Sequence, residues 1–349
     1  MLMANTHDGA TSRPLLEIEE LEVAFAKDGG QQKVICGMSL AIRAGEIVAL
    51  VGESGSGKSM TALSTVQLLP PGASIMGGRI GFDGRNLLDC SPRELNAIRG
   101  GRIAMLFQQP HAMLDPTCRV GVQVSEALRI HRGASRHTAE TRALELLREV
   151  GIPEPALRAK AYAHELSGGM AQRVMIAAAL SGDPDLLIAD EPTTALDVTV
   201  QAQILDLLNE QRRRRGLAIL LITHDLSVVS AIADRIAVMY AGRIVEEGPK
   251  DAVLHDPQHP YTHALMHCST LEVGPDGKLI SIPSGATRAM DLDHGCRFHP
   301  RCAVAEELGI ADQCHRSEPA LVPSHRGDGK VRCWAAEARL AAPAKDILQ

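Results

Sequence analysis

The sequence has few aromatic residues, no excess of positive charge and no long apolar run. Only 2% of its 349 residues are aromatic, too few for the stacking surface that holds single-stranded nucleic acid. Lysine and arginine number 36 against 42 aspartates and glutamates, a formal net charge of −6, so no basic surface for nucleic acid or anionic lipid is predicted. The longest apolar runs, such as residues 217–223, have the length of a strand and fall short of the ~18 residues of a membrane-spanning helix.

A secretory signal is also missing from the start of the chain. Residues 1–13 are polar and lack the apolar core of a signal peptide, which predicts a cytosolic protein with reduced thiols. We therefore expect the eight cysteines to be free thiols or metal ligands, and no disulfide framework. With 45% hydrophobic and 22% charged residues, the chain is not wholly disordered, and its length allows about two domains at ~150 residues each.

Buried strands alternate with helices over most of the chain. Strand-like patterns are predicted at residues 15–18, 21–25 and 38–43, and unbroken apolar runs predict buried strands at residues 46–51, 186–189 and 218–223. Helices are predicted at residues 58–69, ended by two prolines, across residues 125–152, and around Val200 to Leu208. Strands that alternate with helices imply a parallel sheet with crossover connections.

The composition changes near residue 255. Seven prolines lie between residues 257 and 323, and four of the eight cysteines lie between residues 296 and 333. We predict three parts: a loose N-terminal tail, one α/β domain, and a C-terminal extension that contains these cysteines. Their bounds are residues 1–14, 15–255 and 256–349.

A phosphate-binding loop is predicted at residues 52–59, GESGSGKS, which follow a buried strand and open a helix. Glycines let the backbone N–H groups turn inward, and the helix start adds positive potential, so the loop can cradle a polyphosphate. Lys58 is expected to reach the β and γ phosphates, and the Ser59 hydroxyl to ligate Mg²⁺. The expected nucleotide-binding residues are Gly52, Ser54, Gly55, Gly57, Lys58 and Ser59. A turn that merely joins strand to helix is the alternative, and the complete motif in its required context disfavours it.

Two adjacent carboxylates, Asp190 and Glu191, follow the second buried apolar run. An aspartate there can hold Mg²⁺ through its hydration shell, and the next glutamate can orient and deprotonate an attacking water. By itself such a pair is more often the solvated start of a loop. The phosphate loop upstream favours the catalytic interpretation.

A second anion site is predicted at residues 166–170, LSGGM, which precede an apolar helix. Ser167, Gly168 and Gly169 at a helix start present free N–H groups, which a chain with one phosphate loop does not itself need. We therefore expect Ser167 and Gly169 to contact the ATP held by the phosphate loop of a second chain. The alternative is a simple N-cap.

Together and in this order, these motifs resemble those of the ATP-binding-cassette ATPases. The matching segments are residues 52–59, 107–108, 166–169, 190–191 and 195–197, with His224. The resemblance spans residues 15–255. It implies an α/β nucleotide-binding domain with a parallel-sheet core, a small antiparallel β subdomain and a helical subdomain, which binds ATP and Mg²⁺.

The resemblance also implies roles for single residues. Phe25 is similar to the aromatic that stacks on adenine, and Gln108 to the glutamine that touches Mg²⁺ and the attacking water. Glu191 is similar to the general base, and His224 to the residue that contacts the γ-phosphate. A core aromatic of the antiparallel sheet is the alternative for Phe25, and a structural histidine the alternative for His224.

Two further positions in the family motifs need comment. Asp197 is expected at the nucleotide site, with the N-cap of the following helix as an alternative or second role. Met170 stands where the family signature usually has glutamine, which removes one polar contact and leaves the Ser-Gly-Gly backbone intact.

The C-terminal segment is similar to the extension of the dipeptide and oligopeptide importer ATPases. Residues 259–265, HPYTHAL, and 295–302, GCRFHPRC, carry this similarity, and Met170 is less unusual in that subfamily. It implies a peripheral subunit on the cytoplasmic face of the inner membrane that powers peptide import. The implied partners are a second ATPase subunit, two transmembrane permease subunits facing residues 108–116, and an external solute-binding protein. The resemblance implies a related second ATPase subunit, and a second copy of this chain is the alternative.

Other functions remain alternatives at this point. The same subfamily includes importers of nickel and metal chelates, so the cargo is open. A soluble cassette ATPase without a membrane partner and a non-hydrolysing regulatory subunit are disfavoured by the importer-like extension and by Glu191, respectively.

A metal centre is predicted from Cys296, Cys302, Cys314 and Cys333, which have 5, 11 and 18 residues between them. They lie in a segment with few apolar residues, which a metal would stabilise. The closely spaced pairs of zinc sites and the ferredoxin run are both missing. By resemblance to importer ATPases with this extension, we expect a [4Fe–4S] cluster, with Zn²⁺ or unliganded thiols as alternatives.

Overall fold

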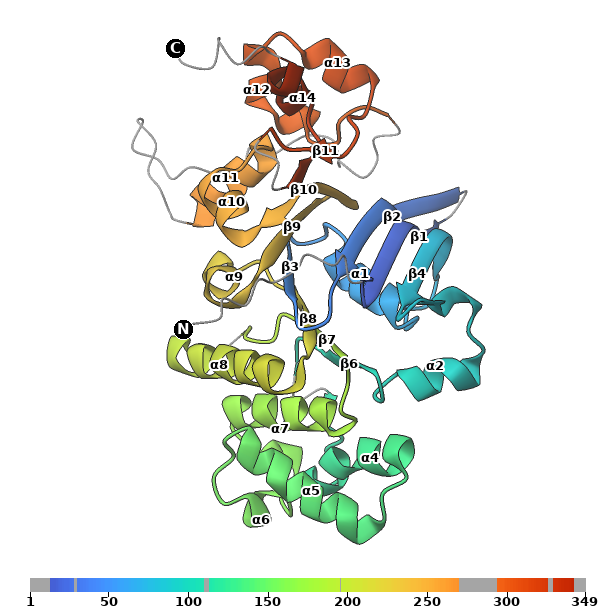
Figure 1. The fold of residues 1–349 in the computed structure, drawn as a ribbon, viewed down its shortest axis with the longest axis vertical. Coiled ribbons are helices and arrows are strands. Elements are labelled where there is room, and N and C mark those ends of the chain that lie inside the picture. The colour runs from blue at the N-terminus through green and yellow to red at the C-terminus, as the bar shows by residue number, and fades with distance from the viewer. Residues whose placement is uncertain are drawn as a thin grey trace, which may run out of the picture.

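The computed structural model describes residues 13–27, 30–109, 113–194, 196–269, 294–325 and 329–341. Most of the predicted N-terminal tail, part of the turn near residue 29, Ala195 and the centre of the predicted membrane-facing segment lie outside the described residues. Figure 1 shows the described elements along one long axis, with a helical group at one end and the C-terminal elements at the other.

Within the described residues, an eight-stranded sheet forms the centre of the molecule, in the order β11-β12-β10-β9-β3-β8-β7-β6. In that order the strands are Val322–Pro323, Lys330–Val331, Arg243–Pro249, Arg235–Tyr240, Ile47–Val51, Ala218–Ile222, Leu186–Asp190 and Ile103–Leu106. The strands from β9 to β6 run parallel, which confirms the predicted parallel sheet with crossovers. Strands β3, β7 and β8 are buried along their whole length, as their unbroken apolar runs predict.

A second, four-stranded antiparallel sheet lies beside the first in Figure 1, with the order β2-β1-β4-β5 among the described residues. Its strands are β1 Leu16–Lys27, β2 Gly30–Ile42, β4 Ala73–Phe82 and β5 Arg85–Asn86. The two strand segments predicted before residue 26 are one strand. Glu20 has a φ of 45°, and the pairing of β1 with β2 shifts register there, so β1 has a bulge at this point. The bulge interrupts the apolar pattern, and the sequence therefore suggests two strands where there is one.

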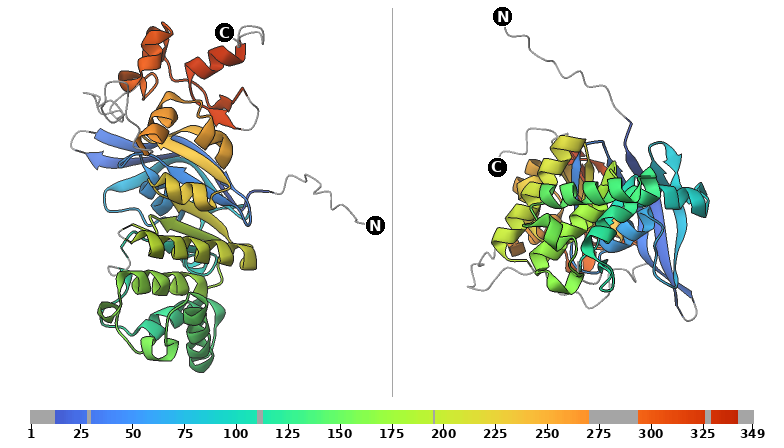
Figure 2. Two further views of the ribbon diagram at one scale, coloured as in Figure 1. Left: turned by 90° about the vertical axis from the view of Figure 1, so that its left-hand side faces the viewer. Right: turned by 90° about the horizontal axis from the view of Figure 1, so that it is seen from below.

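Helices cover the parallel sheet and form the two ends of the molecule. The helices on and below the sheet are α1 Lys58–Thr65, α2 Pro92–Ile98, α4 Val120–Arg132, α5 Arg136–Glu149, α6 Pro155–Arg158, α7 Gly168–Ser181, α8 Val198–Arg215 and α9 Leu226–Ile232. The C-terminal part contains α10 Lys250–His255, α11 Pro260–Ser269, α12 Ala303–Glu307, α13 Ala311–Arg316 and α14 Trp334–Ala341. Short 3₁₀ turns occur at Leu87–Asp89, Ala163–Glu165 and His299–Arg301. The left view of Figure 2 shows helices α4 to α7 together at the end opposite α12 to α14.

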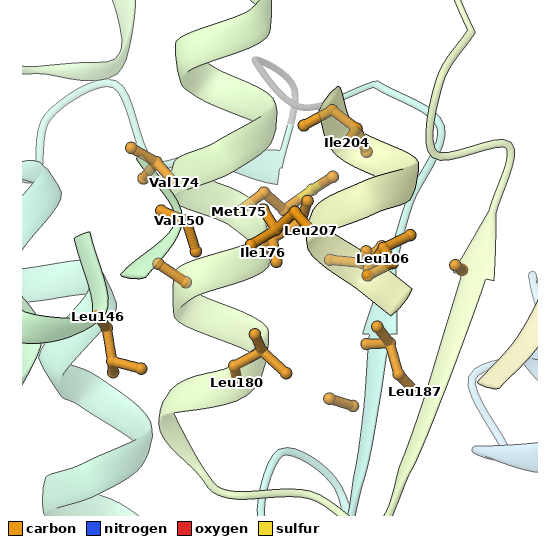
Figure 3. Packing of buried hydrophobic residues seen from close by; sticks show 14 of the residues in the cluster. Leu106, Leu146, Val150, Val174, Met175, Ile176, Leu180, Leu187, Ile204 and Leu207 are labelled. Atoms are coloured by element: carbon orange, nitrogen blue, oxygen red, sulfur yellow. The ribbon is translucent and has the colours of Figure 1, made fainter. Parts of the chain in front are cut away.

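The main core lies between strands β6, β7 and β8 of the central sheet and helices α4, α5, α7 and α8. Figure 3 shows Leu180 of α7 between Leu146 of α5 and Leu187 of β7, with Leu106 of β6 and Leu207 of α8 nearby. All of these side chains are buried. Because β7 carries the paired carboxylates at its end, this packing fixes the position of the candidate site.

Helix α1 is shorter than its apolar pattern predicts. It ends at Thr65, because Gln67 takes a φ of 51° and Leu68 N–H donates to Leu63 O at 2.8 Å, which closes the last turn. The two prolines after Leu69 are therefore not what stops the helix.

The C-terminal extension continues the central sheet. Strand β12 pairs antiparallel with β10, and β11 pairs with β12. The Glu246 carboxylate, only 4% exposed, accepts the backbone N–H groups of Gln258 and His259 at 2.8 and 2.9 Å, which fixes the start of α11. A buried carboxylate thus joins the extension to the sheet.

Candidate nucleotide-binding site

The predicted phosphate loop connects the buried strand β3 to helix α1, as its motif requires. Gly52 has a φ of 151°, and a Cβ atom there would lie 2.1 Å from Met239 O. Gly57, the residue before α1, has a φ of 110°, and a Cβ atom there would lie 2.8 Å from the Met239 side chain. Only glycine fits these two positions, because the loop is pressed against the end of β9.

Lys58 is buried at the start of α1, with 7% of the residue exposed. Its Nζ donates to Gly52 O at 2.8 Å and to Glu53 O at 2.9 Å. Burial lowers the pKa of Lys58, and the nearby carboxylates of Glu191, Asp190 and Glu53 act against that shift. The ammonium group therefore lies inside the loop, where two backbone carbonyl oxygens accept its hydrogen bonds.

A buried hydroxyl of the loop is also unused. Ser56 Oγ has no hydrogen-bond partner among the described residues, although Ser56 is only 3% exposed. Ser54 and Gly55 lie at the outer turn of the loop, where Gly55 has a φ of 78°. A buried cation, an unpaired hydroxyl and close-packed glycines fit a polyphosphate ligand.

Ser59 at the start of α1 contacts Asp190 at the end of β7. The Ser59 hydroxyl donates a hydrogen bond to the Asp190 carboxylate, which is 8% exposed. Burial raises the pKa of Asp190, the neighbouring Glu191 adds to the rise, and Ser59 and Lys58 oppose it. A hydroxyl and a carboxylate beside a phosphate site are hard oxygen ligands of the kind that Mg²⁺ prefers.

Glu191 is the centre of a hydrogen-bonded group. Its Oε2 accepts from Gln108 Nε2 at 2.6 Å and from Thr194 Oγ1 at 2.9 Å, and its Oε1 lies 2.8 Å from His224 Nδ1. Burial acts to raise the pKa of Glu191, but the hydrogen bonds from His224 and Thr194 and the charge of Lys58 outweigh it, so the pKa is lowered. The structure thus brings the three predicted catalytic residues together around an ionised carboxylate.

The backbone at Glu191 explains how the side chain is aimed. Glu191 has a φ of 48°, and its N–H donates to Ile222 O of β8 at 2.8 Å. The left-handed conformation turns the chain immediately after β7 and presents the carboxylate at the strand ends. Thr194, to which the sequence analysis gave no role, reaches back to Glu191 because this turn brings it there. A hydroxyl three residues beyond the glutamate is the signal that would have identified it.

Phe25 lies on β1, next to the strand that touches the phosphate loop. It pairs with Gln32 of β2, and Val34 O of the same strand would lie 3.0 Å from a Cβ atom on Gly57. Phe25 is half-buried and does not belong to the buried core around this sheet. Its role as the aromatic that stacks on adenine stays a prediction.

The predicted second anion site caps helix α7. Ser167 Oγ accepts from Met170 N–H at 3.4 Å, and Gly168 begins the helix. A Cβ atom on Gly169 would lie 2.9 Å from the side chain of Val200 in α8, so these two helix starts are in contact. Asp197 Oδ1 accepts from Val200 N–H at 2.9 Å, which confirms that it is the N-cap of α8.

These helix starts are not part of the chain's own phosphate loop. Helix α7 packs on α4, α5 and β6, whereas α1 packs on β2 and β7. Figure 1 shows α7 well apart from α1. Within one chain, therefore, the structure brings the phosphate loop, the carboxylates, Gln108 and His224 together, and leaves Ser167, Gly168 and Gly169 elsewhere.

The four C-terminal cysteines line one shared pocket between α12, α13 and the start of α14. Cys296, Cys302, Cys314 and Cys333 all contribute to it. Burial raises the pKa of Cys296 to about 12, and the other three thiols add to the shift. In the part of the chain that the structure describes, however, no group of three or more histidine, cysteine or acidic side chains is arranged to hold a metal ion. The predicted [4Fe–4S] cluster is therefore not confirmed.

None of the described helices combines the length and the apolar character needed to span a bilayer.

Comparison with known proteins gives matches to both parts of the chain. The family model described as ABC transporter matches residues 35–194, and the model described as the C-terminal region of oligopeptide/dipeptide transporters matches residues 245–308. The dipeptide transport ATP-binding protein DppD of Escherichia coli is 43% identical over 307 residues, 88% of this chain and 92% of that protein. The oligopeptide transport ATP-binding protein OppD of Bacillus subtilis is 48% identical over 301 residues, 86% of this chain and 84% of its own.

Solved structures match the nucleotide-binding part. The dimeric post-hydrolysis structure of the ATP-binding cassette MJ0796 with ADP and Pi has a TM-score of 0.61 and 30% sequence identity. The match covers 67% of this chain and 98% of that cassette.

Proposed function

The chain belongs to the ABC transporter family and carries the C-terminal region of its oligopeptide and dipeptide transporters, and from this we propose that it is the ATP-hydrolysing subunit of a peptide importer. The observation that carries the proposal is the ionised Glu191 beside the phosphate loop, hydrogen-bonded by Gln108 and Thr194 and adjacent to His224. We assign the domain bounds as residues 15–255 for the ATPase and 256–349 for the importer-type extension.

In this proposal, the chain's own residues hold ATP at the start of α1. Lys58 exchanges the carbonyls of Gly52 and Glu53 for phosphate oxygens, and the loop N–H groups bind the remaining phosphate charge. Ser59 and Asp190 would hold Mg²⁺, which supplies charge neutralisation on the phosphates when it is bound. Phe25 would stack on the adenine.

Glu191 then acts as the base toward the attacking water. Its carboxylate accepts the water proton while Gln108 and Thr194 keep one oxygen in place, and His224 contacts the γ-phosphate. Because the lowered pKa keeps Glu191 ionised at neutral pH, the acceptor is in the correct form before ATP binds.

The complete site requires a second cassette. Ser167, Gly168 and Gly169 lie away from the chain's own loop, and their free N–H groups at the start of α7 are available to the phosphates bound by a partner. Asp197, at the adjoining start of α8, would lie in the same interface. The relative MJ0796 is described as a dimer, which supports this arrangement.

The remaining partners follow from the relatives. Their printed names are dipeptide and oligopeptide transport ATP-binding proteins, so we propose two permease subunits, an external solute-binding protein, and a peripheral position at the cytoplasmic face of the inner membrane. The cargo is a dipeptide or oligopeptide in this proposal, with nickel or a metal chelate as the competing cargo.

Co-purification and hydrolysis test the proposal together. After mild detergent extraction the protein should be recovered with hydrophobic membrane subunits, and the complex should hydrolyse ATP only with Mg²⁺. A protein recovered alone, with no Mg²⁺-dependent hydrolysis, would contradict it.

The metal centre at the four cysteines stays a prediction. It is supported by the pocket that the four thiols share, because thiolates grouped in one place are typical ligands of iron and zinc. Iron, sulfide and zinc analysis of anaerobically purified protein decides between a [4Fe–4S] cluster, Zn²⁺ and free thiols, and the Cys302→Ser variant should lose any metal found. Protein without metal would remove this part of the proposal.

A further inference from the structure

Glu53, the second residue of the phosphate loop, is held by the C-terminal extension. Its backbone N–H donates to the Tyr261 hydroxyl at 2.8 Å. Its carboxylate accepts two hydrogen bonds from the Arg301 guanidinium, at 2.9 and 3.0 Å. Both partners lie more than 200 residues further along the chain. The loop and the extension are thus joined by a charged, two-point contact.

Arg301 is itself fixed by its surroundings. Its side chain is 15% exposed, its Nη1 also donates to the Tyr240 hydroxyl at 3.2 Å, and its guanidinium lies over the rings of Tyr240 and Phe298. The rings of Tyr240, Tyr261 and Phe298 contact one another, with centroids 4.6 to 5.5 Å apart. A partly buried, bidentate pair on an aromatic base is far more rigid than an exposed surface ion pair.

The same Glu53 supports the lysine of the loop. Its carbonyl oxygen accepts from Lys58 Nζ at 2.9 Å, and its negative charge acts on Lys58. An unpaired carboxylate at this position would repel the phosphates of a bound nucleotide. Arg301 supplies the opposite charge from outside the loop.

We propose that Arg301 and Tyr261 are positioning residues for the phosphate loop: they fix Glu53 and neutralise its carboxylate, so that ATP affinity depends on the C-terminal extension. The inference rests on the proposed ATP-binding function and goes beyond it, because it makes the extension part of the nucleotide site. The Tyr261 hydroxyl fixes the backbone of Glu53, and the Arg301 guanidinium neutralises the Glu53 carboxylate.

The Arg301→Gln variant tests whether the positive charge of Arg301 contributes to ATP binding. It should raise the KM for ATP about tenfold, the size expected for removing one partner of a partly buried charged pair, with a smaller change in kcat. Glu53→Gln added to Arg301→Gln removes the unpaired carboxylate and should restore the KM to within about twofold of the parent. Arg301→Lys keeps the charge without the bidentate contact and should lie between the two.

Two further variants separate this effect from damage to the fold. Arg316→Gln in α13 breaks an exposed pair with Asp312 and serves as the matched control, with an unchanged KM. Tyr261→Phe keeps the aromatic packing and removes the acceptor for Glu53 N–H, so it should raise the KM by about threefold. Thermal unfolding of each variant is measured in parallel, and the Arg301→Lys variant keeps the test valid if Arg301→Gln folds poorly.

The possible results separate a failure of this inference from a failure of the proposed function. An unchanged KM in Arg301→Gln overturns the inference, and so does a raised KM that Glu53→Gln fails to relieve, because the effect would then be one of folding. A parent protein that binds no ATP refutes the proposed function, and the inference with it. A parent that binds ATP while Arg301→Gln binds it equally well refutes the inference alone.

Discussion

Replacing Glu191 by glutamine should lower the rate of ATP hydrolysis by at least ~10²-fold without disturbing the site. Glu191 Oε2 accepts from Gln108 and Thr194, and the amide oxygen of glutamine can take over both hydrogen bonds. The amide nitrogen then faces His224 Nδ1, which accepts in its other tautomer. No buried donor is left unpaired, so the free energy of unfolding should change by less than ~1 kcal/mol.

The Glu191→Gln substitution removes only the group that accepts the proton of the attacking water. General-base catalysis contributes ~10²–10⁴-fold, and each factor of ten is about 1.4 kcal/mol of activation free energy, so we expect kcat to fall by at least ~10²-fold, or about 3 kcal/mol. The affinity for ATP should stay within about twofold, because Lys58 and the loop are untouched.

The assay is steady-state ATP hydrolysis with saturating Mg²⁺, together with ATP binding by calorimetry on the same preparation. Glu140→Gln is the matched control, since Glu140 is exposed on α5 and pairs with Arg136 in a surface contact. Hydrolysis by Glu191→Gln at the rate of the parent would refute the assignment of the base. A large loss of ATP binding would show that Glu191 contributes to the binding of ATP and not specifically to the hydrolysis step.

Lys58→Ala should weaken ATP binding by at least ~10-fold, measured by calorimetry, because the phosphates lose the one buried ammonium of the loop; equal affinity would contradict its role. Gly169→Val should prevent the ATP-dependent dimerisation expected of Glu191→Gln protein in sedimentation, because the added side chain meets Val200 at the helix start; ATP-dependent dimers of the double variant would contradict the composite site. The pKa of His259 is lowered from 6.5 to about 3 by burial, and its Nδ1 accepts from Tyr261 N–H, so the neutral ring stabilises the fold above pH ~6.5. This stability is lost as the pH falls toward 3, by at most ~1.4 kcal/mol per pH unit, and His259→Gln should show a shallower acid slope in denaturant unfolding; identical slopes would contradict it.

Much of the nucleotide site could be predicted because it depends on local sequence. The strand, loop and helix around Lys58 are contiguous, and the burial of β3 and β7 follows from unbroken apolar runs. Parallel strands carry their carboxyl ends to one edge, so Asp190 lies near the phosphate loop by topology alone.

The rest depends on contacts between distant segments or on backbone conformations that side-chain patterns do not encode. The Arg301–Glu53 pair spans 248 positions, and neither residue has a local feature that identifies the other. The bulge at Glu20 and the helix end at Gln67 both use a positive φ at a residue other than glycine, which nothing in the apolar periodicity marks. Four cysteines could be assigned to one pocket from their segment, but their arrangement within it is set by tertiary packing.

Peptide uptake into proteoliposomes tests whether ATP hydrolysis by this chain drives peptide import. The vesicles would contain this chain with its co-purified membrane subunits, and labelled peptide would be added with the binding protein on the side opposite ATP. We predict accumulation that requires Mg²⁺ and ATP, proceeds in step with hydrolysis, and stops in vesicles with Glu191→Gln although ATP still binds. Equal peptide accumulation by the parent and Glu191→Gln proteins, or hydrolysis by the parent without any ATP-dependent uptake, would contradict peptide import driven by hydrolysis at Glu191.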